Sequence, residues 1–307
     1  MRAYWIALTL AVVPATPAGA MPHCFGAAAR DPEHPCVNHR LDSVAIPSPD
    51  AALLQPSAPC RVVRRTDPAV CAFGRSDKTA TVALLGDSHA VHWRAALTRV
   101  ARAERWRGMS ITRTQCPFTL ARKAHGACRG FARRTLRWLG HHRSIRTVFV
   151  SANDGVSLVA PRATYRETQM REYMRAWAAL PPTVHEVYVL RDVPEASIRT
   201  APCVKRAVAH HRTVGVACAR PRSHALKTDY EAVAAARYAA SPYSDHRVRL
   251  IDLAPFMCDD RRCFPVVGGA LVIKDRGHLT RTFSATLGPY LRRAVERLRQ
   301  AGQATPP

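Results

Sequence analysis

Short apolar runs alternate with longer stretches of helical periodicity from residue 81 to the end of the chain. A short apolar run bounded by small or polar residues predicts a buried strand, and apolar positions three or four residues apart predict a helix. The predicted strands are Thr81–Leu85, Gly108–Thr112, Thr147–Ser151, Val184–Leu190 and Val248–Leu253. The predicted helices are Ala90–Arg105, Phe131–His141, Thr164–Ala179, Asp229–Ala240 and Thr282–Gln300. This alternation favours an α/β fold, a three-layer α/β/α sandwich of flavodoxin-like type with a five-stranded parallel sheet.

The pattern differs before residue 81. Residues 21–80 contain four cysteines and many prolines and show little periodicity, which predicts a disulfide-stapled extension packed on a main domain at 81–307. This extension either covers a face of the core or helps to form a substrate cleft.

Residues 1–20 have the form of a signal peptide. Arg2 precedes the short apolar stretch Trp5–Val13, and Ala18-Gly19-Ala20 suits cleavage. We therefore expect a periplasmic or secreted protein, with an uncleaved N-terminal anchor as the alternative. No later segment reaches the roughly 18 uninterrupted apolar residues of a membrane span, so we expect none after cleavage.

The ten cysteines agree with export, because an even number in an exported chain indicates disulfides. They fall into close pairs: Cys24 and Cys36, Cys60 and Cys71, Cys116 and Cys128, Cys203 and Cys218, Cys258 and Cys263. We favour bonds between neighbours, since each would close one local loop, although sequence alone leaves the connectivity open. Metal binding is the alternative, and the lack of any C-x-x-C spacing argues against structural zinc.

The formal net charge is +24, and most of the excess is arginine. A basic surface attracts polyanions, and nucleic acid is one of them. The anions that an exported chain meets outside the cytoplasm are acidic glycans, lipid head groups and envelope polymers. The even spread of the charge favours compositional bias over a dedicated nucleic-acid surface, so we expect no nucleic-acid partner.

The turn Gly86-Asp87-Ser88-His89 joins the first predicted strand to its helix. Such a corner lifts one side chain out of the sheet and sets it at the positive end of the helix dipole. Ser88 occupies that corner, where backbone N–H groups could hold a developing oxyanion. The alternative is structural, because Asp and Ser at this position often cap a helix.

A second polar group, Asp275 and His278, precedes the last predicted helix. Their spacing lets both side chains face the same way, so the carboxylate can orient the imidazole as a base. Functional groups gather beyond the carboxyl ends of parallel strands, which predicts that Ser88, Asn153 and this pair share one sheet edge. Ser88, His278 and Asp275 then make a nucleophile, base and orienting acid for acyl transfer. The alternatives for the pair are a helix cap and a half-exposed histidine.

His89 and His92 lie three residues apart, a spacing that could suit a metal on a helix. No carboxylate or third histidine is suitably spaced nearby, so we expect neither a metal nor a cofactor. Instead, we place His89, like Asp87, beside the catalytic residues.

Gly86-Asp87-Ser88-His89 near the start of the domain and Asp275-x-x-His278 before its last helix resemble the SGNH (GDSL-type) hydrolase superfamily. The chain is similar to the SGNH domains that are fused to, or accompany, membrane acyltransferase-3 proteins. Gln115-Cys116-Pro117, the Cys258–Cys263 loop and the segment 275–280, Asp-Arg-Gly-His-Leu-Thr, add to the likeness, which covers residues 81–299.

The resemblance implies a role for each matching residue. Ser88 matches the nucleophile and one oxyanion donor, His278 the base, Asp275 its orienting acid, and Asn153 a side-chain oxyanion donor. The chain departs from the family in having Ser151 where a glycine is usual. The third donor is not placed either, because Gly108 starts a predicted strand and does not end one.

The resemblance and the export signal together imply an esterase or acyltransferase acting on O-acyl groups, acetyl first, of cell-envelope glycans. The expected partners are an acylated, possibly acidic, envelope polysaccharide and a membrane acyltransferase-3 protein. Hydrolase and transferase remain open. The alternative is a non-catalytic glycan-binding partner of a membrane acyltransferase.

Overall fold

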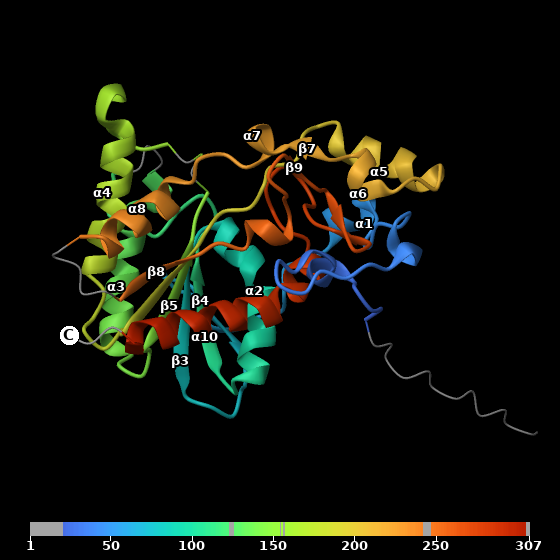
Figure 1. Cartoon of the computed structure of the whole chain (residues 1–307). Helices are drawn as coiled ribbons and strands as arrows, with labels where there is room; N and C mark the ends of the chain where they lie inside the picture. Colours follow the sequence, from blue (N-terminus) through green and yellow to red (C-terminus); the bar gives the residue numbers. More distant parts are fainter. Residues whose placement is uncertain (1–20, 123–125, 154, 156, 242–246, 305–307) are drawn as a thin grey trace, which may run out of the picture.

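A computed structural model describes residues 21–122, 126–153, 155, 157–241 and 247–304, and a seven-stranded sheet forms its centre (Figure 1). The strand order is β1-β2-β4-β3-β5-β6-β8. Five neighbouring strands, from β4 to β8, run parallel. The strands of this sheet are β1 Arg61–Arg64, β2 Val70–Gly74, β3 Ala80–Gly86, β4 Arg107–Thr112, β5 Thr147–Ser151, β6 Glu186–Leu190 and β8 Val248–Ile251.

The predicted strand number was too low, because the stretch before residue 81 adds an antiparallel hairpin to the parallel strands. β2 pairs with β4, and β1 pairs with β2 at the sheet edge. All four residues of β1 are exposed, so this strand lacks the apolar pattern that marks a buried one. The bond between Cys60 and Cys71 fastens the hairpin.

Helices cover both faces of the sheet, as the alternating pattern predicts. The large helices are α2 Ser88–Ala103, α3 Phe131–His141, α4 Tyr165–Ala178, α8 Tyr230–Ala239 and α10 Gly288–Ala304. Successive residues of β3 face opposite layers: Val82 and Leu84 pack with α2 and α10, whereas Ala83 and Leu85 pack with α3, α4 and α8. The result is the expected α/β/α sandwich.

The predicted closing helix, Thr282–Gln300, is two helices. α9 spans Arg281–Thr286, and α10 starts at Gly288. Pro289 explains the break, because it has no amide N–H to donate to the preceding turn, which is tolerated only in the first turn of a helix.

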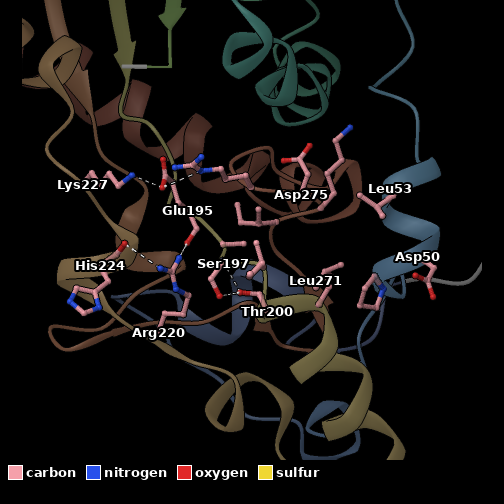
Figure 2. A pocket seen from close by; sticks show the side chains of 17 residues that line it. Asp50, Leu53, Glu195, Ser197, Thr200, Arg220, His224, Lys227, Leu271 and Asp275 are labelled. Carbon is pink, nitrogen blue, oxygen red and sulfur yellow. Dashed lines mark hydrogen bonds and ion pairs between the residues drawn. The ribbon is translucent and has the colours of Figure 1, made fainter. Parts of the chain in front are cut away.

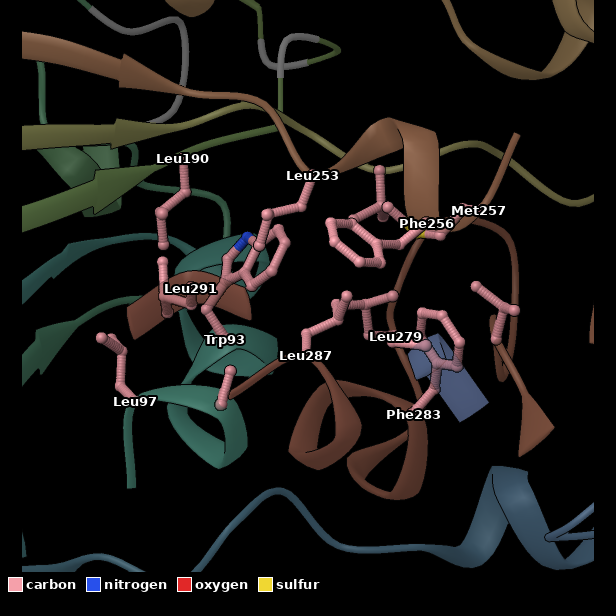
Figure 3. Close-up of a cluster of buried hydrophobic side chains, with 14 of the residues drawn as sticks. Trp93, Leu97, Leu190, Leu253, Phe256, Met257, Leu279, Phe283, Leu287 and Leu291 are labelled. Atoms are coloured by element: carbon pink, nitrogen blue, oxygen red, sulfur yellow. The ribbon is translucent and has the colours of Figure 1, made fainter. Parts of the chain in front are cut away.

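α2 and the C-terminal segment share one apolar cluster (Figure 3). Trp93 and Leu97 of α2 lie among Leu279, Phe283 and residues of α10. The Ser284 hydroxyl also donates to the His92 carbonyl at 2.6 Å. Because Leu279 directly follows His278, this packing sets the Asp275–His278 loop against the first turns of α2.

The remaining elements are short. They are η1 Gly26–Arg30, η2 His39–Leu41, α1 Pro49–Leu54, η3 Gly126–Cys128, η4 Arg162–Thr164, α5 Thr200–Ala209, α6 Val214–Ala217, β7 Arg220–Pro221, α7 Arg222–Ala225, η5 Ala254–Phe256, β9 Arg262–Cys263, β10 Val266–Val267 and β11 Ala270–Leu271. α1 and α5 meet in a small apolar cluster that includes Ala52, Val204 and Leu271. Helix α1 is therefore packed against the segment between β6 and β8.

The structure pairs every cysteine with its neighbour, the connectivity that we favoured from the sequence. The bonds are Cys24–Cys36, Cys60–Cys71, Cys116–Cys128, Cys203–Cys218 and Cys258–Cys263. The signal peptide predicted at 1–20 lies outside the described residues. Among the helices that are described, none combines the length and the apolar character needed to cross a bilayer.

Candidate active site

The turn between β3 and α2 is built around Asp87. Its buried side chain caps α2 by accepting from the His89 N–H at 2.8 Å, and it also accepts from the Asn153 N–H at 3.0 Å. Burial raises the pKa of the Asp87 carboxyl, and the charge of His89 and the two N–H donors oppose that shift. Asp87 therefore ties the end of β3 to the end of β5. Since Asp87 is the cap, the partly exposed Ser88 is not needed for that role.

Asp275 and His278 form a hydrogen-bonded pair. His278 Nδ1 lies 2.9 Å from Asp275 Oδ2, and Asp275 Oδ1 accepts from the backbone N–H groups of His278 and Gly277 at 2.9 and 3.0 Å. Burial alone would raise the pKa of Asp275, but the hydrogen bonds and charge of His278 outweigh it and lower that pKa to about 2. The carboxylate thus stays ionised and holds a proton on Nδ1, which leaves the Nε2 lone pair free to act as a base.

The structure brings His278 against the first turn of α2, which begins with Ser88. The imidazole rings of His278 and His89 have centroids 4.7 Å apart, and those of His278 and His92 are 6.2 Å apart. His278 Nε2 is buried and has no hydrogen-bond partner among the described residues, so it is not bonded to the Ser88 hydroxyl. Catalytic hydrogen bonds are often long before substrate binds and shorten in the reacting complex.

Asn153 follows β5 at the same edge as Ser88. Its backbone is fixed by Asp87, and its side-chain oxygen accepts from the Gly155 N–H at 2.7 Å. The carboxamide N–H groups are therefore the part of Asn153 that remains to meet an oxyanion. Gly108 lies four residues before the carboxyl end of β4, and a Cβ there would meet the Phe73 ring at 2.2 Å. Gly108 thus serves packing against Phe73.

Sequence reasoning missed a second imidazole–carboxylate pair, His89 and Asp192. His89 Nδ1 lies 2.6 Å from Asp192 Oδ1, and the two side chains are 4% and 19% exposed. Burial alone would lower the pKa of His89, but the charge and hydrogen bond of Asp192 outweigh it and raise that pKa to about 9. A buried imidazolium therefore lies beside His278, the residue predicted to be the base. Asp192 lies shortly after predicted strand four, at the sheet edge where functional groups gather. That position was the one sign in the sequence that Asp192 could belong to the site.

Asp192 has its own support. Its N–H donates to Asp229 Oδ2 at 2.7 Å, and Asp229 also caps α8. Burial and the nearby charge of Asp192 raise the pKa of Asp229 to about 6. By contrast, burial lowers the pKa of His92 well below its ordinary value, and the positive charge of His89 lowers it further. The two histidines of α2 thus differ in charge.

Asp192→Asn should lower the pKa of His89 from about 9 to below 6.5, because the buried imidazolium loses its counter-charge. A raised folded-state pKa stabilises the wild type fully below the unfolded value of 6.5, and this contribution is lost as pH rises through about 9. The variant should not lose this stability between pH 6.5 and about pH 9. Imidazole NMR titration measures the pKa of His89, and urea unfolding at the two pH values measures the change in stability.

Asp252→Asn is the matched control, because Asp252 pairs with Arg191 and with no histidine among its described contacts. An unchanged His89 titration in Asp192→Asn would contradict the assignment.

Potential metal ligands come together within the described residues at His23, Cys24 and Cys36. Cys24 and Cys36 are bonded to each other, so their thiolates are not free to bind a metal.

Comparisons with known proteins identify the family and support the fold. A family model described as "SGNH domain (fused to AT3 domains)" matches residues 59–293. Among solved structures, the periplasmic domain of a lipopolysaccharide acetyltransferase from Salmonella ser. Paratyphi A aligns with a TM-score of 0.53 at 14% identity. The alignment covers 71% of this chain and 85% of that one, and at this identity it supports the fold alone. A search of curated proteins found no match. The family match covers most of the chain, which thus belongs to the family of SGNH domains fused to AT3 domains.

Proposed function

We propose that the chain is an exported serine esterase or acyltransferase that acts on O-acyl groups, acetyl first, of cell-envelope glycans. The observation that carries the proposal is the Asp275–His278 pair, held against the turn of α2 that begins with Ser88. Family membership supports acyl chemistry, and the acetyltransferase title of the structural neighbour supports a glycan substrate. The disulfides and that neighbour's periplasmic origin support a periplasmic or secreted location.

In the first half of the reaction, the Ser88 oxygen attacks the acyl carbonyl and His278 Nε2 takes the hydroxyl proton. The carbon–oxygen bond of the donor ester then breaks, and the departing alcohol takes the proton from His278. In the second half, His278 takes a proton from water or from a sugar hydroxyl, which attacks the acyl group on Ser88. The bond between the acyl carbon and the Ser88 oxygen then breaks, and His278 returns the proton to that oxygen. Asp275 keeps the imidazole in the required tautomer throughout.

The oxyanion would rest on the Ser88 N–H and the Asn153 carboxamide. Losing one such donor costs about 2.7–4 kcal/mol where it has been measured, so a site with two donors needs further electrostatic help. The buried His89 imidazolium and the N-terminus of α2 supply positive charge close to Ser88. We therefore propose that His89, held by Asp192, supports the oxyanion through its charge.

Family membership also suggests a membrane partner. SGNH domains of this family are fused to AT3 domains. We propose that a membrane acyltransferase-3 protein exchanges the acyl group with this domain.

Ser88→Ala should abolish turnover of an aryl acetate, because no other group at the site replaces the nucleophile. Ser76→Ala is the matched control, since Ser76 is exposed in the turn before β3, at the opposite end of the sheet from the site. Initial rates of both variants and the wild type at equal concentration measure the effect. Equal rates in the wild type and Ser88→Ala would contradict the proposal and favour a non-catalytic glycan-binding protein.

A further inference from the structure

Asp275, the carboxylate partner of His278, lines a cavity of about 640 Å³ (Figure 2). One wall is α1 of the N-terminal extension, and another is the segment from Glu195 into α5. Residues 274–276 form the side that contains Asp275, whose carboxylate orients His278. The volume falls within the roughly 300–1,000 Å³ of small-ligand pockets. The cavity therefore directly adjoins the proposed catalytic pair, with Asp275 in its wall.

The lining is largely apolar at its base and rim. Leu271 and Ile273 are buried, whereas Leu53 and Ile198 are 60% and 95% exposed. Leu53 belongs to α1 and Ile198 precedes α5, so the extension and the later segment each present an uncovered aliphatic side chain. Aliphatic surface of this kind can pack against the C–H face of a sugar ring.

The charged groups of the cavity are unevenly paired. Glu195 Oε2 lies 2.6 Å from Lys227 Nζ and 3.8 Å from Arg276 Nε, so one carboxylate serves two cations. Arg220 donates to the carbonyl oxygens of Glu195 and His224 and has no carboxylate partner among the described residues (Figure 2).

The other carboxylates of the lining are already engaged. Asp50 Oδ1 pairs with Lys205 Nζ at 2.6 Å, and Asp275 pairs with His278. Lys274, like Arg220, makes no ion pair within the described part of the chain. The cavity thus keeps positive charge that its own carboxylates do not neutralise.

We infer that this cavity binds an anionic sugar of the acylated glycan, with its carboxylate or phosphate near Arg220 and Lys274. The inference rests on the proposed function and deepens it by naming the substrate class. Uncompensated cations attract an anion, and the aliphatic lining accepts the ring that carries it. Because Asp275 lines the cavity, a sugar bound there would place its neighbours in the chain toward His278 and Ser88.

The proposal also gives a role to residues 21–80 and to the Cys203–Cys218 bond. α1 and α5 pack on each other through Ala52 and Val204, and the disulfide joins α5 to the end of α6. The walls of the cavity are therefore held in place before any ligand arrives, which reduces the entropy cost of binding.

The test is direct binding to the Ser88→Ala chain, which removes turnover from the measurement. The probes are trigalacturonate, a neutral galactose trisaccharide and inorganic phosphate. Calorimetry measures the affinity of each probe at low and at high salt. We expect trigalacturonate to bind more tightly than the neutral sugar and to weaken with salt. Lys274→Gln and Arg220→Gln should each weaken it about tenfold, as for one charged hydrogen bond.

The matched control is Arg137→Gln, because Arg137 lines a second arginine-rich cavity of about 680 Å³ that does not include the catalytic pair. If inorganic phosphate binds, trigalacturonate does not, and Lys274→Gln abolishes phosphate binding, the anionic group of the sugar is a phosphate and not a carboxylate. Unchanged affinity in both pocket variants, equal binding of the neutral sugar, or no binding of any anion would overturn the inference. Aryl acetate turnover by the wild type is measured separately. Turnover without glycan binding would overturn only this inference, whereas a lack of turnover would overturn the proposed function.

Discussion

His278→Gln is expected to lower the rate of aryl acetate turnover by about 10²–10⁴-fold, the range of a lost general base. Glutamine can still donate to Asp275, so the loop geometry should persist while the proton acceptor at Nε2 disappears. The wild-type pH–rate profile should show one rising limb, that of the general base, and the variant should lack it. Asp275 adds no second rise above about pH 4, because its pKa is lowered to about 2.

Two controls separate chemistry from structure in this experiment. Urea unfolding at neutral pH should show that His278→Gln folds normally, since the side chain is 30% exposed. His142→Gln is the matched substitution, because His142 is exposed and follows α3 on another part of the surface. A rising pH–rate limb of wild-type amplitude in His278→Gln would show that another group is the base.

Gly86→Ala is expected to destabilise the fold by about 3–5 kcal/mol or to prevent folding. Gly86 has a φ of +137°, and a Cβ there would lie 2.1 Å from the Ser151 carbonyl oxygen and 2.9 Å from the Ala90 Cβ. The nearest obstacle is backbone, so β5 or α2 must move, and either movement displaces Ser88. Urea unfolding and the soluble yield measure the effect.

Gly140→Ala provides the comparison, because Gly140 lies in α3 and a Cβ there would meet no atom within 4 Å. Alanine in a helix interior is about 0.8–1.0 kcal/mol better than glycine, so this variant should be slightly more stable. Wild-type stability in Gly86→Ala would mean that the turn into α2 is looser than the structure has it.

The parallel core was predictable because its central strands β3, β5 and β6 are buried on both faces. β5, at Thr147–Ser151, is buried along its whole length and begins and ends where the apolar run does. β1 was missed for the opposite reason, since a fully exposed edge strand has no such pattern. α10 shows a different limit, because continuous apolar periodicity hid the break that Pro289 makes in the backbone.

Some residues of the candidate site could be predicted from the sequence, and others could not. Ser88 and the Asp275–His278 pair stand out because each lies within a short motif at a chain position where a turn is expected. Asp192 is 103 residues from His89, and only the folded sheet brings them together. The cavity is assembled from α1, α5 and the loop before α9, so no local pattern in the sequence indicates it.

Covalent labelling tests most directly whether Ser88 and His278 act together, because it needs neither the natural acyl donor nor the acceptor. A fluorophosphonate is reacted with the wild type, Ser88→Ala and His278→Gln, and the adduct is located by peptide mass spectrometry. We expect one phosphonyl group on Ser88 in the wild type, none in Ser88→Ala, and labelling at least about 10²-fold slower in His278→Gln. Labelling at another residue, or equal rates in the wild type and His278→Gln, would show that the two side chains do not form one catalytic unit.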